Sequence, residues 1–210
     1  MAVVKPAGLL VQGDSTGDKT LLDVCKAYLK EKYQKPGNVY LGLVHRLDRP
    51  VSGVVLLART SKAASRLSAQ FRDGTVDKTY LAVVEGQPQR AEGALAHHLA
   101  PRADTKGRTR CEDEPFQGSR ESYLTYRVVV KGDRPLLRVE PITGRRHQIR
   151  VQLAAMGCPI VGDVKYGAKE PLPDRSVALH AWRLDCVHPV GGRTMNFKAS
   201  PPVGGPWPLF

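Results

Sequence analysis

The chain has 210 residues, of which 41% are hydrophobic and 25% are charged, which is typical of a folded globular protein and excludes a disordered tail. Its 32 lysines and arginines against 20 acidic residues give a formal net charge of +12, which favours a polyanionic partner such as RNA or DNA, with general solubility as the simpler explanation. The longest apolar runs have about six residues, far fewer than the roughly 20 of a membrane span, and the N-terminus does not resemble a signal peptide. We therefore expect a soluble protein that contacts no membrane and resides in the cytoplasm, or alternatively in an organelle.

The first half of the chain alternates short apolar runs with amphipathic segments. Leu21, Cys25 and Leu29 recur at helical spacing, and Ser61 stands at the start of a second segment with helical periodicity. Helices are therefore predicted over 20–33 and 61–72. Strands are predicted within 2–12 and over 41–44, 53–58 and 78–86.

The second half begins with a segment that has few large apolar residues, 87–120, for which we expect an irregular or hairpin excursion. Further strands are predicted over 122–130, 136–142, 177–189 and 193–199, a helix over 145–156, and an irregular tail over 200–210. These elements predict one α+β domain spanning residues 1–210, in which helices and loops flank a mixed, mostly antiparallel central sheet.

An acidic residue, Asp48, stands between the apolar runs LGLV and GVVLLA, with Arg46 and Arg49 on either side of it. Burial alone would raise the pKa of this carboxyl and neutralise it, whereas a cationic partner would keep it ionised. Residues two apart in an extended segment share a face, so only one arginine need point the same way as Asp48. A structural aspartate that caps a turn or pairs with an arginine remains an alternative.

A second polar cluster, TGRRHQIR, places Arg145, Arg146, His147 and Arg150 at the predicted start of a helix. Because the N-terminal end of a helix carries positive partial charge, cations are unfavourable there unless a phosphate or a carboxylate lies nearby. His147 and Arg150 are three residues apart and therefore share one helix face. The alternative is a solvated basic face.

Other candidate features carry less information. Tyr80 precedes an apolar strand and is of functional interest only if it faces Asp48. The sequence has no phosphate-binding loop motif, no G-x-S-x-G motif and no set of metal ligands, and for the adjacent His97 and His98 we expect a structural or solvent-exposed role. We therefore expect no metal and no small-molecule cofactor.

Four stretches, in the same order along the chain, resemble the motifs of the RluA-type pseudouridine synthases. They are VVKPAGLLV, HRLDRPVSGVVLLA, KTYLAVVEG and PITGRRHQIRVQLAAMGCPIVGDVKYG, followed by the late strand LHAWRL. Two positions depart from the family pattern, which has threonine where this chain has Val51 and Arg146. Many members of this family carry an S4-type RNA-binding domain, and because this chain begins almost at the first motif, we expect a catalytic domain without one.

This resemblance implies the pseudouridine synthase fold and specific roles. Asp48 aligns with the catalytic aspartate, Tyr80 with the active-site tyrosine and Arg150 with the arginine that pairs with the aspartate. Arg46 aligns with a residue that fills the gap left by a flipped base, and Leu179 with an apolar wall. The remaining candidates for substrate binding in these motifs are His45, Arg145 and His147.

The resemblance further implies an isomerase that converts uridine to pseudouridine in ribosomal or transfer RNA, after the target base has been flipped out of its stack. We expect the enzyme to act as a monomer without a cofactor. Two other functions compatible with the same residues are a basic RNA-binding or assembly factor that lacks catalysis and a nuclease that uses His147 and Asp48.

Overall fold

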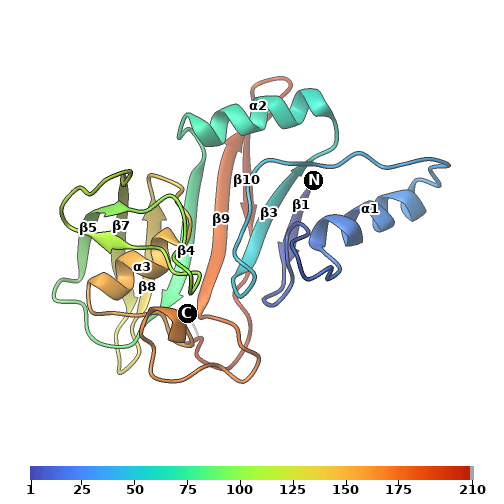
Figure 1. The fold of residues 1–210 in the computed structure, drawn as a ribbon. Coiled ribbons are helices and arrows are strands. Elements are labelled where there is room, and N and C mark those ends of the chain that lie inside the picture. The colour runs from blue at the N-terminus through green and yellow to red at the C-terminus, as the bar shows by residue number, and fades with distance from the viewer. Residues whose placement is uncertain (209–210) are drawn as a thin grey trace.

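One mixed sheet runs through the structure, a computed structural model that describes residues 1–208 (Figure 1). Within these residues the strands lie in the order β1 (Ala2–Lys5), β3 (Ser52–Ala58), β9 (Leu179–Val187), β4 (Asp77–Val83), β8 (Leu136–Pro141), β7 (Arg120–Val130), β5 (Glu92–Leu99) and β6 (Cys111–Glu112). The short strand β2 (Gly42–Leu43) pairs with β3, and β10 (Thr194–Lys198) pairs with β9. The pairing of β3 with β9 is parallel and the other pairings are antiparallel. The predicted α+β class with a mostly antiparallel sheet is confirmed.

The parallel contact between β3 and β9 depends on the dipeptide Ser52–Gly53. Gly53 has a φ of +122°, and a Cβ atom at this position would lie 2.3 Å from the carbonyl oxygen of Ala181, so only glycine lets the two backbones approach this closely. Beside it, the Ser52 hydroxyl lies 2.8 Å from Nδ1 of the buried His180. These contacts fix the start of β3, and with it the loop that carries Asp48.

Three helices cover the sheet (Figure 1). α1 (Leu21–Lys32) lies beside β1 and begins with a capping box in which Thr20 and Asp23 satisfy each other's backbone N–H groups. α2 (Ser61–Arg72) lies across the ends of β3, β9 and β10. α3 (Gln148–Ala155) lies on the β5–β7–β8 part of the sheet, and the 3₁₀ turn η1 (Val164–Tyr166) follows it. None of the described helices is long and apolar enough to cross a membrane.

Both faces of β3 are buried, which explains the uninterrupted apolar run GVVLLA. Val55 and Leu57 belong to the larger core that also contains Leu81, Leu137 and Leu153. The alternate side chains of this strand join a second core under α2, together with Leu67 and Leu184. β3 therefore contributes apolar side chains to both hydrophobic cores.

The structure corrects two predictions of local structure and decides between the two alternatives of a third. The segment 87–120, expected to be an irregular or hairpin excursion, contains the eight-residue strand β5 paired antiparallel with the short strand β6, so the hairpin alternative holds. The helix predicted over 145–156 begins at Gln148, because His147 adopts a left-handed conformation with a φ of 52°. The strand predicted over 41–44 is limited to Gly42–Leu43. Residues 200–208 contain no regular element, and the last two residues of the predicted irregular tail lie outside the described residues.

Candidate active site

A cavity of about 100 Å³ opens where the loop before β3 faces the strands β4 and β9 and the N-terminal end of α3. The loop contributes Arg46, Leu47, Asp48 and Val51, and the strands contribute Lys78, Tyr80 and Leu179. The remaining wall is the segment that leads from β8 into α3, comprising Pro141, Thr143, Gly144, Arg145, His147, Gln148, Ile149 and Arg150. The fold thus brings the two polar clusters of the sequence to one site.

Arg150 is the cationic partner of Asp48. Its Nη1 atom lies 3.1 Å from Oδ2 of Asp48, and its Nε and Nη2 atoms each lie 2.7 Å from an oxygen of Asp163. The Asp163 side chain is 1% exposed and that of Arg150 is 6% exposed, whereas that of Asp48 keeps 29% of its surface. Asp163 therefore holds the guanidinium by a bidentate contact from inside, and Asp48 is the carboxylate that solvent or a ligand can reach.

The charges around Arg150 keep its guanidinium protonated. Burial lowers the pKa of Arg150, but the hydrogen bonds and charges of Asp163 and Asp48 together outweigh burial and leave this pKa above its ordinary value. The guanidinium is therefore a permanent cation, and its Nη1 atom lies 3.1 Å from Oδ2 of Asp48.

His147 also approaches Asp48. Its Nε2 atom lies 3.6 Å from Oδ2 of Asp48, and its Nδ1 atom lies 2.7 Å from the hydroxyl of Tyr166, which accepts the backbone N–H of Thr109 at 2.8 Å. Burial, opposed by Asp48 and reinforced by Arg150, lowers the pKa of His147 to about 4. The imidazole is therefore neutral at neutral pH.

The two oxygens of Asp48 have different surroundings. Arg150 and His147 both approach Oδ2, whereas no group of residues 1–208 forms a hydrogen bond with Oδ1. One oxygen is thus used for orientation, and the other is available to a molecule in the cavity.

A buried lysine anchors the loop that carries Asp48. Lys5 has no exposed surface, and its ammonium donates hydrogen bonds to the carbonyls of Pro6, Leu9 and Arg49 at 2.9, 2.8 and 3.1 Å. Burial lowers the pKa of Lys5 to about 8, although the charge of Asp48 opposes this effect. Lys5 therefore fixes the backbone directly after Asp48 without occupying the cavity.

The arginines that flank Asp48 in the sequence do not pair with it. Arg49 forms an ion pair with Asp18 at 2.8 Å and donates to the carbonyl of Gly8, whereas Arg46 is exposed at the rim of the cavity. The arginine that pairs with Asp48 comes instead from α3, far along the chain.

Tyr80 lies in the same cavity as Asp48. Burial and the charge of Asp48 both raise the pKa of its phenol, which therefore stays protonated at neutral pH. Val51 and Leu179 supply buried apolar surface beside it. An aromatic ring and two aliphatic side chains next to a reachable carboxylate suit a flat heterocycle with a polar edge.

The structure brings together all but one of the site residues predicted from the sequence. The members that line the cavity are Arg46, Asp48, Tyr80, Arg145, His147, Arg150 and Leu179. His45 is the exception, because its Nε2 accepts the backbone N–H of Leu56 at 2.8 Å and its ring stacks on Phe71. Burial, with a contribution from Lys78, lowers the pKa of His45 to about 4, so its ring is a neutral packing element outside the cavity.

The basic cluster has a different local structure from the predicted one. Arg145 and Arg146 are exposed and precede α3 rather than forming its first turn. The turn is held by Gln148, whose Oε1 accepts the backbone N–H of Arg145 at 2.9 Å and the hydroxyl of Thr143 at 2.8 Å. The two exposed arginines are therefore presented to solvent beside the cavity.

Sequence reasoning missed four residues that shape the site: Lys5, Lys78, Asp163 and Tyr166. All four lie inside the motifs quoted above, which is the signal that could have found them. Lys78 is two residues before Tyr80 on the same strand and lines the cavity. Within residues 1–208 no cluster of three or more histidine, cysteine, aspartate or glutamate side chains has the arrangement of a metal site.

Comparison with known proteins identifies the class. Residues 1–155 match the family model described as RNA pseudouridylate synthase, so the chain belongs to this family and the resemblance seen in the sequence is confirmed. The chain is 34% identical over 206 residues to the ribosomal large subunit pseudouridine synthase C of Rickettsia felis and covers 96% of its own length but 65% of that protein. It is 36% identical over 202 residues to the dual-specificity RNA pseudouridine synthase RluA of Salmonella typhi, covering 94% of itself and 87% of that protein.

Solved structures agree with this assignment. The fold matches human RNA pseudouridylate synthase domain containing 4 with a TM-score of 0.79 and 25% identity, covering 96% of this chain and 85% of that one. It matches human RNA pseudouridylate synthase domain containing 1 with a TM-score of 0.72 and 28% identity, covering 95% and 78%. The predicted pseudouridine synthase fold is therefore confirmed.

Proposed function

We propose that this protein is an RNA pseudouridine synthase in which Asp48 is the catalytic carboxylate. The observation that carries this proposal is the geometry of Asp48, which is held through Oδ2 by Arg150 while Oδ1 remains available in the cavity. The reaction breaks the N1–C1′ bond of uridine and forms a C5–C1′ bond. The proton on C5 is released and N1 gains one, so the atoms balance without an oxidant, a reductant or water.

An ionised Asp48 serves each of the three chemical routes to this product. It can attack C1′, attack C6, or remove the proton from C2′. Tyr80 lines the cavity, and we propose that its ring stacks on the uracil, a contact that contributes about 1–3 kcal/mol in other nucleic-acid complexes, and that its hydroxyl donates a proton. Leu179 and Val51 form apolar walls around the ring.

A uridine within folded RNA must leave its stack to enter this cavity, at a cost of roughly a few kcal/mol. Arg46 is exposed at the rim, where its guanidinium can occupy the gap that the base leaves. Arg145 lies at the same rim, and both side chains carry charge that phosphates would neutralise. His45 lies outside the cavity, so we assign it no contact with the substrate.

We propose ribosomal RNA of the large subunit as the first substrate to examine and transfer RNA as the second. The name of the Rickettsia relative supports large-subunit ribosomal RNA as the first choice, and the dual specificity in the name of the Salmonella relative supports testing a second kind of RNA. We also propose that residues 1–210 act as one catalytic domain, which is supported by the single sheet that joins the N-terminal and C-terminal strands.

The proposal is tested by incubating the purified protein with in vitro transcripts of large-subunit ribosomal RNA and of transfer RNA, followed by chemical mapping of pseudouridine. New pseudouridine in either transcript is the expected result. Binding without pseudouridine in both would support the RNA-binding factor instead, and strand breaks on a denaturing gel would support the nuclease.

A further inference from the structure

We propose that Tyr166 is a positioning residue, whose hydroxyl holds His147 in the tautomer that carries its proton on Nε2, so that this N–H faces the Asp48 carboxylate. This inference rests on the proposed function only in that Asp48 is taken as the reacting group. The contacts that carry it run from Thr109 through Tyr166 and His147 to Asp48.

The tautomer follows from counting donors at the Tyr166 hydroxyl. This oxygen accepts the backbone N–H of Thr109 at 2.8 Å, and a backbone N–H can only donate. The second contact is with Nδ1 of His147 at 2.7 Å. If Nδ1 carried a proton, both contacts would be donors, and the phenolic proton would have no acceptor among the described residues. If the phenol donates to Nδ1, all three groups are satisfied, which avoids the cost of an unmade hydrogen bond, about 1–3 kcal/mol.

The same tautomer suits the Asp48 side of the ring. A neutral imidazole that accepts at Nδ1 has its proton on Nε2, the atom that lies 3.6 Å from Oδ2 of Asp48. The opposite tautomer would place a nitrogen lone pair next to a carboxylate oxygen, which is repulsive. The distance is slightly longer than a direct hydrogen bond, and such contacts commonly shorten when substrate binds.

His147 is held neutral, so the tautomer determines what it can do. Its side chain is 8% exposed, and the cations Arg146, Arg150 and Lys165 disfavour a further positive charge there. The ring of Tyr166 is itself fixed, because the Arg150 guanidinium lies 5.1 Å from its centroid. Arg150 and His147 therefore approach the same oxygen of Asp48 from two sides, and both are held by residues of the segment 163–166.

The loop between β5 and β6 also contributes to this chain of contacts. Thr109 belongs to this loop, and its N–H occupies one lone pair of the Tyr166 oxygen. The loop therefore contributes to the orientation of Asp48 although it does not line the cavity.

The direct test is nuclear magnetic resonance of the full chain labelled with ¹⁵N-histidine at neutral pH, with the His147 signals assigned by their loss in His147→Gln. We expect the wild type to show a protonated Nε2 and a non-protonated Nδ1, and Tyr166→Phe to show a mixture of tautomers. Tyr123→Phe is the matched control, because Tyr123 is an exposed tyrosine whose hydroxyl donates to Glu121, and it should leave the His147 signals unchanged. A proton on Nδ1 in the wild type, or an unchanged tautomer in Tyr166→Phe, would overturn the proposal.

The kinetic test uses tritium release from 5-tritiated RNA. We expect Tyr166→Phe to lower kcat about tenfold with little change in KM, because the lost contact orients the reacting group and does not bind the substrate. If Tyr166→Phe does not fold, His147→Gln and His147→Leu give a second comparison. Glutamine can place an amide N–H where Nε2 lies, so it should retain more activity than leucine, and equal activity in the two variants would contradict the inference. The tautomer measurement needs no activity, so a protein that makes no pseudouridine would refute the proposed function and leave this inference standing.

Discussion

Nη1 of Arg150 lies 3.1 Å from Oδ2 of Asp48, across a sequence separation of 102 residues. Within its own segment neither residue has a partner of opposite charge: Asp48 has no local cation, and Arg150 is a buried cation. Together they form an ion pair that uses Oδ2 of Asp48, and Oδ1 forms no hydrogen bond with any described residue. Asp163 completes the unit by holding the guanidinium from the interior side.

Asp163→Asn tests that unit. The change keeps the shape of the side chain but removes the charge that neutralises Arg150, and removing one partner of a buried ion pair typically costs about 3–5 kcal/mol. We expect the free energy of unfolding, measured by urea denaturation, to fall by this order, and catalytic activity to fall even where the protein remains folded. Asp174→Asn is the control, because Asp174 is exposed and only caps the turn at Ser176. Equal stability of the two variants would mean that Asp163 is not needed to hold Arg150.

Gly53→Ala tests the close contact between β3 and β9. The added Cβ would meet the carbonyl oxygen of Ala181 at 2.3 Å, and the residue would be forced to keep a φ of +122°. We expect a loss of several kcal/mol in the free energy of unfolding, together with loss of activity, because the loop that carries Asp48 leads directly into β3. Gly13→Ala, where a Cβ would meet nothing within 4 Å, should leave the free energy of unfolding nearly unchanged when both variants are measured by thermal and urea denaturation. A near-neutral Gly53→Ala would contradict the proposed constraint.

The half-buried His45 predicts acid sensitivity. Its folded-state pKa is about 4, below the ordinary value of 6.5, so between these pH values the unfolded chain binds a proton that the folded chain does not. The stability that depends on a neutral His45 is therefore present above pH 6.5 and is lost as the pH falls towards 4, by at most about 1.4 kcal/mol per pH unit. His45→Gln, which can still accept the N–H of Leu56, should reduce the pH dependence of urea unfolding between pH 4.5 and 7, with His147 contributing the same sign in both proteins. An unchanged pH dependence would show that His45 titrates normally.

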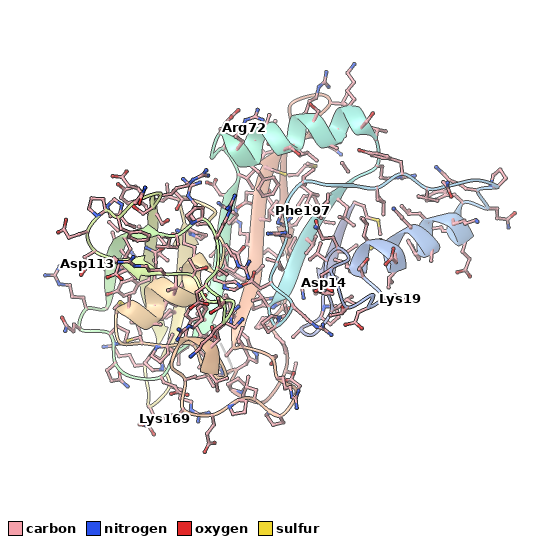
Figure 2. All side chains as sticks on the ribbon, in the orientation of Figure 1. Asp14, Lys19, Arg72, Asp113, Lys169 and Phe197 are labelled. Carbon is pink, nitrogen blue, oxygen red and sulfur yellow. The ribbon has the colours of Figure 1, made fainter. Side chains whose placement is uncertain are left out.

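Lys78 predicts a contact with phosphate. Its ammonium lines the cavity without a hydrogen bond or an ion pair to any described residue, and burial lowers its pKa while Asp77 opposes this effect. We expect Lys78→Gln to weaken RNA binding and to reduce the slope of log affinity against log salt by about 0.7–0.9, the value for one lost phosphate contact. Lys19→Gln removes an equal charge beside α1, at the other end of the view from α3 (Figure 2), and should leave the slope nearly unchanged. The same slope in both variants would exclude a specific contact by Lys78.

The sequence was sufficient to predict those helices and strands whose pattern of apolar residues is visible within the segment itself. The helix predicted over 61–72 is α2 itself, and GVVLLA is a strand buried on both faces as its composition indicates. The sequence leaves β5 open between an irregular segment and a hairpin, because EGALAHHL has only two large apolar residues and what makes it a strand is its full pairing with β7. The start of α3 was placed three residues early because nothing local shows that His147 takes a left-handed conformation.

The residues of the candidate site likewise divide into those that the sequence motifs identify and those that depend on contacts with distant segments. Asp48, Tyr80 and Arg150 were assigned to the site through their alignment with the motifs of the family, because Tyr80 and Arg150 are not distinguished from structural residues by their local sequence. Asp163 was not, since its importance arises only from its contact with Arg150, 13 residues away across a turn. His45 was assigned to the site because it is close to Asp48 in sequence, but the chain turns between them and places its ring on Phe71. Contacts between segments that are far apart in the sequence are what composition and periodicity do not contain.

The most direct measurement of the central claim is tritium release from RNA transcripts labelled at C5 of uridine, compared between wild type, Asp48→Asn and Asp14→Asn. Asp14 is an exposed aspartate that caps the turn at Thr16 and lies beside α1 (Figure 2), so its variant controls for the loss of one carboxylate charge. We predict release by the wild type and by Asp14→Asn, and none by Asp48→Asn while its RNA binding persists. Substantial release by Asp48→Asn would contradict the role assigned to Asp48.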